Sequence, residues 1–123
     1  MPIFLIADDS PEKTEFLQGV LARAAWQGEV LTADTTEDAM AIIDEHPIDA
    51  AFIDYYIPSG NGPCVIAYLK RMRPLARIAL VSSSANADNF ARAKAAGAEA
   101  TVCTFPREDA EERLLELLGG WFV

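Results

Sequence analysis

The 123-residue chain lacks several features that would place it in a common functional class. No apolar run reaches the roughly 18 residues that a transmembrane helix needs, so we expect no membrane span. The formal net charge is −9, which argues against binding to a nucleic-acid backbone, because such binding requires a basic face. The start, MPIFLIADD, has no basic segment and does not read as a signal peptide. These absences predict a cytoplasmic protein.

Cysteine and histidine are also scarce. The two cysteines, Cys64 and Cys103, do not have the spacing of metal ligands, and they predict reduced thiols. The only histidine, His46, precedes Pro47 at an expected helix end, where it suits the helix dipole better than a catalytic role. A cysteine-based metal site, a disulfide framework and histidine catalysis are therefore all disfavoured.

Short apolar runs instead alternate with helical patterns along the chain. Five runs are continuously apolar, as in strands buried on both faces of a parallel sheet: residues 3–7, 30–33, 50–53, 78–81 and 100–103. Helix signals follow each run, and the helices are predicted to begin at Ser10-Pro11, Thr35, Pro63, Asn86 and Pro106. The first helix is predicted to end at Gly28. Five such repeats predict one α/β domain over residues 1–123, with a doubly wound, five-stranded parallel sheet.

Acidic and hydroxyl side chains follow the strands at the carboxyl edge of this sheet, where open α/β folds bind ligands. Asp8 and Asp9 follow the first strand, Asp54 follows the third, and Ser82-Ser83-Ser84 follows the fourth. Converging carboxylates repel one another, and their pKa values rise unless a cation compensates. Mg²⁺ or Mn²⁺ takes such oxygen ligands. The sequence therefore predicts a metal site at the three aspartates; the alternative is a set of solvated loop residues.

The segment FIDYYIPSGNGP indicates what that site does. It places Asp54 at a strand end, and its Gly-Asn-Gly turn is predicted to adopt positive φ and to let backbone amides approach closely. Asp54 is then the best-placed nucleophile for a phosphoryl group, with a metal neutralising the phosphoryl oxygens. Ser82 is placed to donate a hydrogen bond to one of those oxygens.

With these residues the chain resembles a response-regulator receiver domain of two-component signalling over its whole length. The matching residues are Asp8-Asp9, the segment from Asp54 to Pro58 with Gly62, Ser82, and Ala96-Gly97-Ala98. The resemblance implies a flavodoxin-like (βα)5 fold, as in chemotaxis regulators, with strand order 2-1-3-4-5.

The resemblance also implies a role for each site residue. Asp54 would accept a phosphoryl group from a histidine kinase or a histidine phosphotransfer protein. Ser82 would be the switch hydroxyl, and the backbone amide of Ser83 would bind the phosphoryl group. The implied ligands of Mg²⁺ are Asp9, Asp54, the backbone carbonyl of Tyr56 and, through water, Asp8. Such a protein is a signalling switch rather than an enzyme.

Two positions depart from the family pattern. Thr104 stands in VCTFPRE where a lysine is expected, so one positive charge at the phosphoryl group is missing. Thr101 stands where many family members carry an aromatic that swings inward. The second hypothesis is therefore a degenerate receiver that docks partners without phosphoryl chemistry. A third, a Mg²⁺-dependent phosphohydrolase, would want a carboxylate at position 56, which is tyrosine.

The output of the switch is expected to be protein contact. No DNA-binding element follows the predicted domain, so we expect an unidentified output protein or a second copy of the chain in a homodimer. The apolar tail GGWFV either folds back over the last helix or forms a surface that binds a partner.

Overall fold

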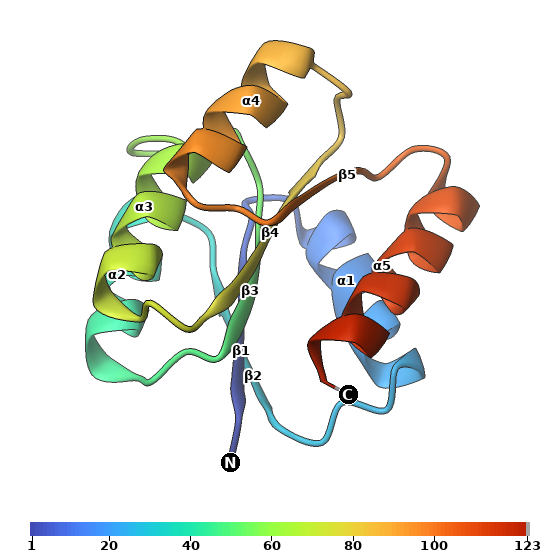
Figure 1. Ribbon diagram of the computed structural model, residues 1–123, viewed down its shortest axis with the longest axis horizontal. Helices are drawn as coiled ribbons and strands as arrows, with labels where there is room; N and C mark the ends of the chain where they lie inside the picture. Colours follow the sequence, from blue (N-terminus) through green and yellow to red (C-terminus); the bar gives the residue numbers. More distant parts are fainter. Residues whose placement is uncertain (123) are drawn as a thin grey trace.

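The computed structural model describes residues 1–122, and its five strands lie between two layers of helices (Figure 1). The strands are β1 (Ile3–Ala7), β2 (Glu29–Ala33), β3 (Ala50–Ile53), β4 (Arg77–Ser82) and β5 (Ala100–Cys103). The helices are α1 (Pro11–Arg23), α2 (Thr36–Glu45), α3 (Gly62–Met72), α4 (Ala87–Ala96) and α5 (Arg107–Trp121). The sheet is parallel in the order β2-β1-β3-β4-β5, which confirms the flavodoxin-like fold.

Each face of the sheet has its own apolar core. Figure 1 shows α2, α3 and α4 on one face and α1 with α5 on the other. Alternate side chains of a strand point to opposite faces, so Leu5 packs with the α2–α4 layer while Phe4 and Ile6 pack with α1 and α5. The two layers leave the carboxyl ends of the strands uncovered by helix, and that edge carries the predicted site.

Burial differs between central and edge strands. Every residue of β1 and β3 is buried, and β4 is buried except at Arg77. The edge strands β2 and β5 are partly exposed, because each has one neighbouring strand instead of two. The expectation that all five runs are buried on both faces is therefore wrong for the two edges.

The first helix ends earlier than the sequence predicts. It stops at Arg23, five residues before Gly28, because Ala25 adopts a left-handed conformation with φ 58°. The amide of Trp26 then bonds back to the carbonyl of Leu21, as in common helix-end motifs. This turn brings the indole of Trp26 against the ring of Phe4, 5.4 Å between centroids.

The C-terminal aromatics belong to the end of α5 and pack against rings of other elements. The ring of Trp121 lies 6.3 Å from that of Phe4 and 6.0 Å from that of Phe52, and Phe122 lies 4.8 Å from Trp26. The expectation that the tail folds back over the last helix is wrong as stated, because residues 119–121 form the last turn of α5 and their helix carries Trp121 against the core. Val123 lies outside the described residues. Within residues 1–122, no helix is both long and apolar enough to cross a membrane.

Candidate functional site

The three predicted aspartates meet at the carboxyl edge of the sheet. β1 and β3 are neighbours with Ala7 paired to Ile53, so the residues that follow them emerge side by side. Asp8, Asp9 and Asp54 each offer a carboxylate oxygen within 4.8 Å of the others. Asp8 is buried, Asp54 is partly exposed and Asp9 is exposed, so the cluster opens to solvent on one side.

Asp8 is held by one hydrogen bond from its backbone and one to its side chain. Its amide donates to the carbonyl of Ala33 at 2.9 Å, and its Oδ1 accepts the amide of Ser10 at 2.9 Å. Burial raises the pKa of the Asp8 carboxyl; the nearby ammonium of Lys13 opposes this shift, and the charge of Asp54 adds to it. The raised pKa of Asp8 thus follows mainly from its burial, and only to a lesser degree from the neighbouring carboxylate.

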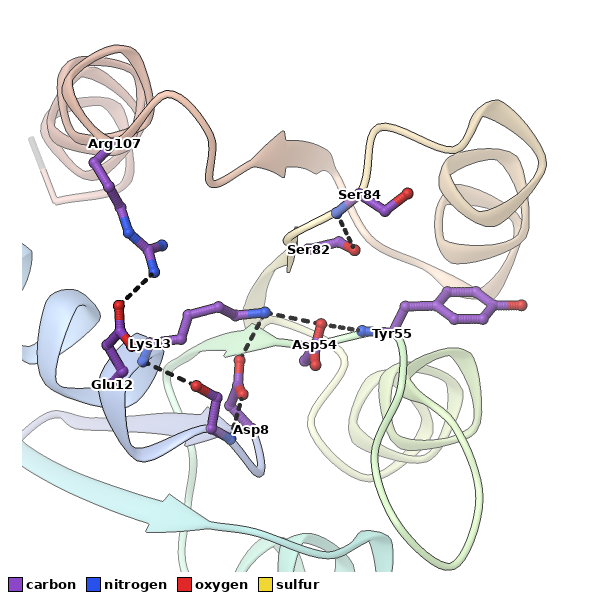
Figure 2. A network of polar contacts seen from close by, with 9 residues as sticks. Asp8, Glu12, Lys13, Asp54, Tyr55, Ser82, Ser84 and Arg107 are labelled. Carbon is purple, nitrogen blue, oxygen red and sulfur yellow. Dashed lines mark hydrogen bonds and ion pairs between the residues drawn. The ribbon is translucent and has the colours of Figure 1, made fainter.

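Lys13 lies at the centre of the site, although the sequence analysis did not assign it. Its Nζ is 2.8 Å from Oδ2 of Asp8 and 2.8 Å from Oδ1 of Asp54, as Figure 2 shows. The residue is only 2% exposed. Its spacing from Leu17, four residues on, was the available signal, because it extends the buried stripe of α1 by one turn.

The loop after β3 holds the acceptor carboxylate. Oδ1 of Asp54 also accepts the amide of Tyr55 at 2.9 Å. Within residues 1–122 no hydrogen bond or ion pair reaches Oδ2, so this oxygen is available to react. Gly62 donates its amide to the carbonyl of Tyr55 at 2.7 Å, and a Cβ at Gly62 would lie 2.1 Å from the carbonyl oxygen of Asp54. The close approach of the Gly62 and Asp54 backbones thus explains why this position is a glycine.

The turn itself differs from the prediction in one respect. The residue with positive φ is Ser59, at 72°, and neither glycine of Gly60-Asn61-Gly62 has it. Asn61 has a different role, because its side chain accepts the amide of Cys64 at 3.0 Å and caps α3.

Two tyrosines connect this loop to α4. Tyr55 is buried and its hydroxyl accepts a hydrogen bond from Arg92 at 3.2 Å. Tyr56 is 62% exposed, and its hydroxyl accepts from the side-chain amide of Asn89 at 3.1 Å. Tyr56 also carries the backbone carbonyl that the resemblance implies as a metal ligand. The acceptor loop is therefore tied to α4 by two side-chain hydrogen bonds.

The serines and Thr104 complete the edge. Ser82 is buried at the end of β4, and its Oγ accepts the amide of Ser84 at 3.3 Å (Figure 2). Ser83 is exposed. Thr104 donates its amide to the carbonyl of Ser82 at 2.8 Å, and its fully buried Oγ1 has no hydrogen-bond partner in the described part of the chain. The hydroxyl at the expected lysine position is thus left without a partner.

Arg107 is a cation of the same edge, but it is engaged elsewhere. Its guanidinium lies over the ring of Phe16 at 4.7 Å and over that of Phe105 at 4.5 Å. Its NH2 group is 3.9 Å from Glu12, toward which it points in Figure 2. Within residues 1–122 its other terminal nitrogen, NH1, is buried without a partner, and no ion pair joins Arg107 to Asp54.

The donor set fits a hard divalent cation. The cluster consists of three carboxylates, and Lys13 supplies one positive charge, which leaves two negative charges uncompensated. Oxygen ligands with one exposed member suit Mg²⁺, which keeps several of its waters. The residues that could hold it are Asp8, Asp9 and Asp54.

Comparisons with known proteins agree with this geometry. The profile of the response regulator receiver domain family matches residues 4–109. The response regulator GtcR of Aneurinibacillus migulanus is 34% identical over 86 residues, which cover 70% of this chain and 35% of that protein. The chain thus spans about a third of the length of this curated relative.

Two solved structures show the same fold. A CheY-like receiver domain protein of Methanospirillum hungatei superposes with a TM-score of 0.81 at 23% identity, covering 98% of this chain and 96% of that one. A response regulator of Burkholderia pseudomallei, solved with a phosphorylated aspartic acid, a calcium ion and citrate, has a TM-score of 0.72 at 18% identity, covering 98% and 72%. The match over residues 4–109 and the acidic edge lead to one conclusion: this chain belongs to the response regulator receiver domain family.

Proposed function

We propose that this receiver takes a phosphoryl group on Asp54 from a histidine kinase or a histidine phosphotransfer protein, with Mg²⁺ bound at the acidic cluster. The observation that carries the proposal is that one carboxylate oxygen of Asp54 is held in place while the other has no hydrogen bond or ion pair within residues 1–122. Its carboxylate is partly exposed at the end of β3, Oδ1 is held by Lys13 and Tyr55, and Oδ2 is not engaged by residues 1–122.

The proposed transfer needs a nucleophile and neutralisation of charge. Oδ2 of Asp54 attacks the phosphorus of a phosphohistidine; the new O–P bond forms as the N–P bond breaks, and the imidazole nitrogen keeps the electron pair and takes up a proton. Mg²⁺ supplies charge neutralisation on the phosphoryl oxygens when bound. Ser82 is proposed to donate a hydrogen bond from its hydroxyl to the transferred group, and Ser83, an exposed residue, is proposed to donate one from its backbone amide.

The ligand set is part of the proposal. Asp9 and Asp54 would bind Mg²⁺ directly together with the carbonyl of Tyr56, and Asp8 would act through water. The Burkholderia pseudomallei neighbour supports the idea, because a phosphorylated aspartic acid and a calcium ion occur in that protein. We further propose that the chain acts in the cytoplasm as a switch rather than as an enzyme, and that its output is contact with another protein or with a second copy of itself.

The test is phosphorylation by a small donor. Wild-type protein incubated with acetyl phosphate and Mg²⁺ should gain the mass of one phosphoryl group in intact-mass spectrometry. Asp54→Asn, which is nearly isosteric, should fold like the wild type and gain no mass. An unchanged wild-type mass in the presence of Mg²⁺, or a phosphorylated Asp54→Asn variant, would contradict the proposal.

Lys13 and Thr104 favour one second candidate, a degenerate receiver that binds partners without phosphoryl chemistry. The expected lysine is absent at Thr104, and the ammonium of Lys13 already neutralises part of the cluster. A site closed by this ion pair would have little affinity for a metal.

Metal titration separates the two candidates. If the first is correct, Mg²⁺ binds with a dissociation constant on the order of millimolar, as suits an exposed oxygen site. Asp9→Ala should weaken this binding, while Asp109→Ala, an acidic residue on α5, should leave it unchanged. No measurable Mg²⁺ binding by the wild type would support the degenerate receiver, and equal affinity in wild type and Asp9→Ala would contradict the proposed metal site.

A further inference from the structure

Lys13 is a charged residue in a position that the fold builds for an apolar one. Its side chain leaves the first turn of α1 on the stripe that also buries Leu17, Val20 and Leu21. Lysine is almost never this buried unless its ammonium is paired, because an unpaired charge in the interior is costly. An apolar side chain would fill the same place without that cost, so the position is held for its charge.

The local backbone aims this charge at the acceptor. Ser10 caps α1 by accepting the amide of Lys13 at 3.2 Å, and the amide of Ser10 in turn donates to Asp8. The lysine thus leaves the helix start next to Asp8 and reaches across the site to Asp54 (Figure 2). An ammonium has three N–H donors. Two face the carboxylates of Asp8 and Asp54, and the third is not used by either.

No other cation of residues 1–122 is paired with Asp54. Lys70 donates to the carbonyl of Ala76, Lys94 lies exposed on α4, and Arg107 is stacked between two aromatic rings. Thr104, at the position expected for the lysine, has an uncharged hydroxyl that is buried without a partner among the described residues.

We propose that Lys13 supplies from α1 the positive charge that holds the phosphoryl group on Asp54, in place of a lysine after β5. The inference rests on the proposed function, because it assigns a residue to the same phosphoryl site. The ammonium already touches the carboxylate that reacts. A phosphoryl group joined to Asp54 brings further negative charge beside Nζ, and the third N–H is the donor available to it.

The same position predicts a competition. The ammonium and a divalent cation draw on the same carboxylates, Asp8 and Asp54, so the lysine should weaken metal binding while it strengthens phosphoryl binding. A neutral residue at position 13 should therefore shift the two affinities in opposite directions. A merely structural lysine would not produce this pair of effects.

The experiment removes the positive charge at position 13 and, in one variant, adds a positive charge at position 104. Four proteins are compared: wild type, Lys13→Met, the double variant Lys13→Met with Thr104→Lys, and the control Lys94→Met, which removes an exposed lysine of α4. Two quantities are measured with Mg²⁺ present. They are the initial rate of phosphorylation of Asp54 by acetyl phosphate, and the affinity for beryllofluoride, a phosphoryl analogue, by calorimetry. Mg²⁺ affinity is measured separately without beryllofluoride.

Lys13→Met should lower the phosphorylation rate and the beryllofluoride affinity by about ten- to a hundredfold, the loss expected for one hydrogen bond to a charged group. Its Mg²⁺ affinity should rise. The double variant should regain part of both losses, because the amide of residue 104 donates to Ser82 at the end of β4 and a lysine there would return a positive charge to this edge. Lys94→Met should match the wild type.

Several results would overturn the inference. A wild-type rate and wild-type beryllofluoride affinity in Lys13→Met would do so. A loss that is accompanied by weaker Mg²⁺ binding and is not restored in the double variant would also do so. If circular dichroism shows that Lys13→Met is not folded, Lys13→Gln replaces it in the same comparison. Wild-type protein that neither gains a phosphoryl group nor binds beryllofluoride would contradict the proposed function itself, whereas phosphorylated wild type with an equally active Lys13→Met contradicts only the role of Lys13.

Discussion

At the scale of single residues, the positive charge beside Asp54 comes from Lys13, whose Nζ is 2.8 Å from Oδ1, whereas Thr104 carries no charge. Because Thr104 stands where the family has a lysine, one positive charge was expected to be missing from the phosphoryl site. On that expectation, Thr104→Lys alone would strengthen phosphoryl binding. With the ammonium of Lys13 already at Asp54, a second one at position 104 would be repelled by the first. We therefore expect little gain from Thr104→Lys unless Lys13 is neutralised as well.

Gly62 is the residue whose backbone packing matters most to the acceptor loop. A methyl group at Gly62 would lie 2.1 Å from the carbonyl oxygen of Asp54, and backbone atoms cannot move aside as a flexible side chain can. Gly62→Ala should therefore lower the free energy of unfolding by about 1–3 kcal/mol, the usual cost of overpacking. Urea denaturation measures the change.

The matched control is Gly119→Ala in α5, where nothing lies within 4 Å of the added methyl group. Alanine is the better helix former, so this variant should gain about 0.5–1 kcal/mol. A Gly62→Ala variant as stable as the wild type would show that the acceptor loop relaxes freely, contrary to the geometry described.

At the scale of elements, the acceptor loop and α4 are connected through Tyr55 and Tyr56. The expected aromatic at position 101 is a threonine, so a change at Asp54 has no large side chain on β5 to move. The hydrogen bonds from Arg92 to Tyr55 and from Asn89 to Tyr56 offer a direct contact between the loop and α4 instead. Neither contact is apparent from the sequence, because the partners lie more than 30 residues apart.

Tyr56→Phe tests this connection. It removes the hydroxyl that accepts from Asn89, a buried residue of α4, and should cost about 0.5–1.5 kcal/mol. Hydrogen exchange should become faster in α4. The control Tyr68→Phe removes the contact of an α3 hydroxyl with Asp44 and should leave α4 exchange unchanged. Equal α4 exchange in all three proteins would show that the loop and α4 are not coupled by this bond.

For the whole molecule, patterns local in the sequence predicted the architecture well. Five apolar runs correspond to the five strands, and Ser10, Thr35 and Asn86 cap their helices as expected. The strand order came from the family resemblance, since local patterns do not specify it. The three aspartates were brought together because parallel strands all end at the same edge of the sheet.

The errors arose where distant residues decide the local structure. The early end of α1 at the left-handed Ala25 accompanies packing of Trp26 on Phe4, a residue of another element. Lys13 was overlooked because a search for apolar periodicity ignores a charged residue, even one on the buried stripe. Its role depends on Asp54, 41 positions away in the chain, which only the folded molecule places 2.8 Å from its ammonium.

The most direct test of the phosphoacceptor proposal is to locate the phosphoryl group within the chain. Protein treated with acetyl phosphate and Mg²⁺ is reduced with borohydride, which converts an aspartyl phosphate to homoserine, and its peptides are sequenced by mass spectrometry. We predict homoserine at position 54 alone, and none when Mg²⁺ is chelated. Phosphate on Ser82 or Ser83, or an unmodified Asp54 under these conditions, would contradict the proposal that Asp54 is the acceptor of this receiver.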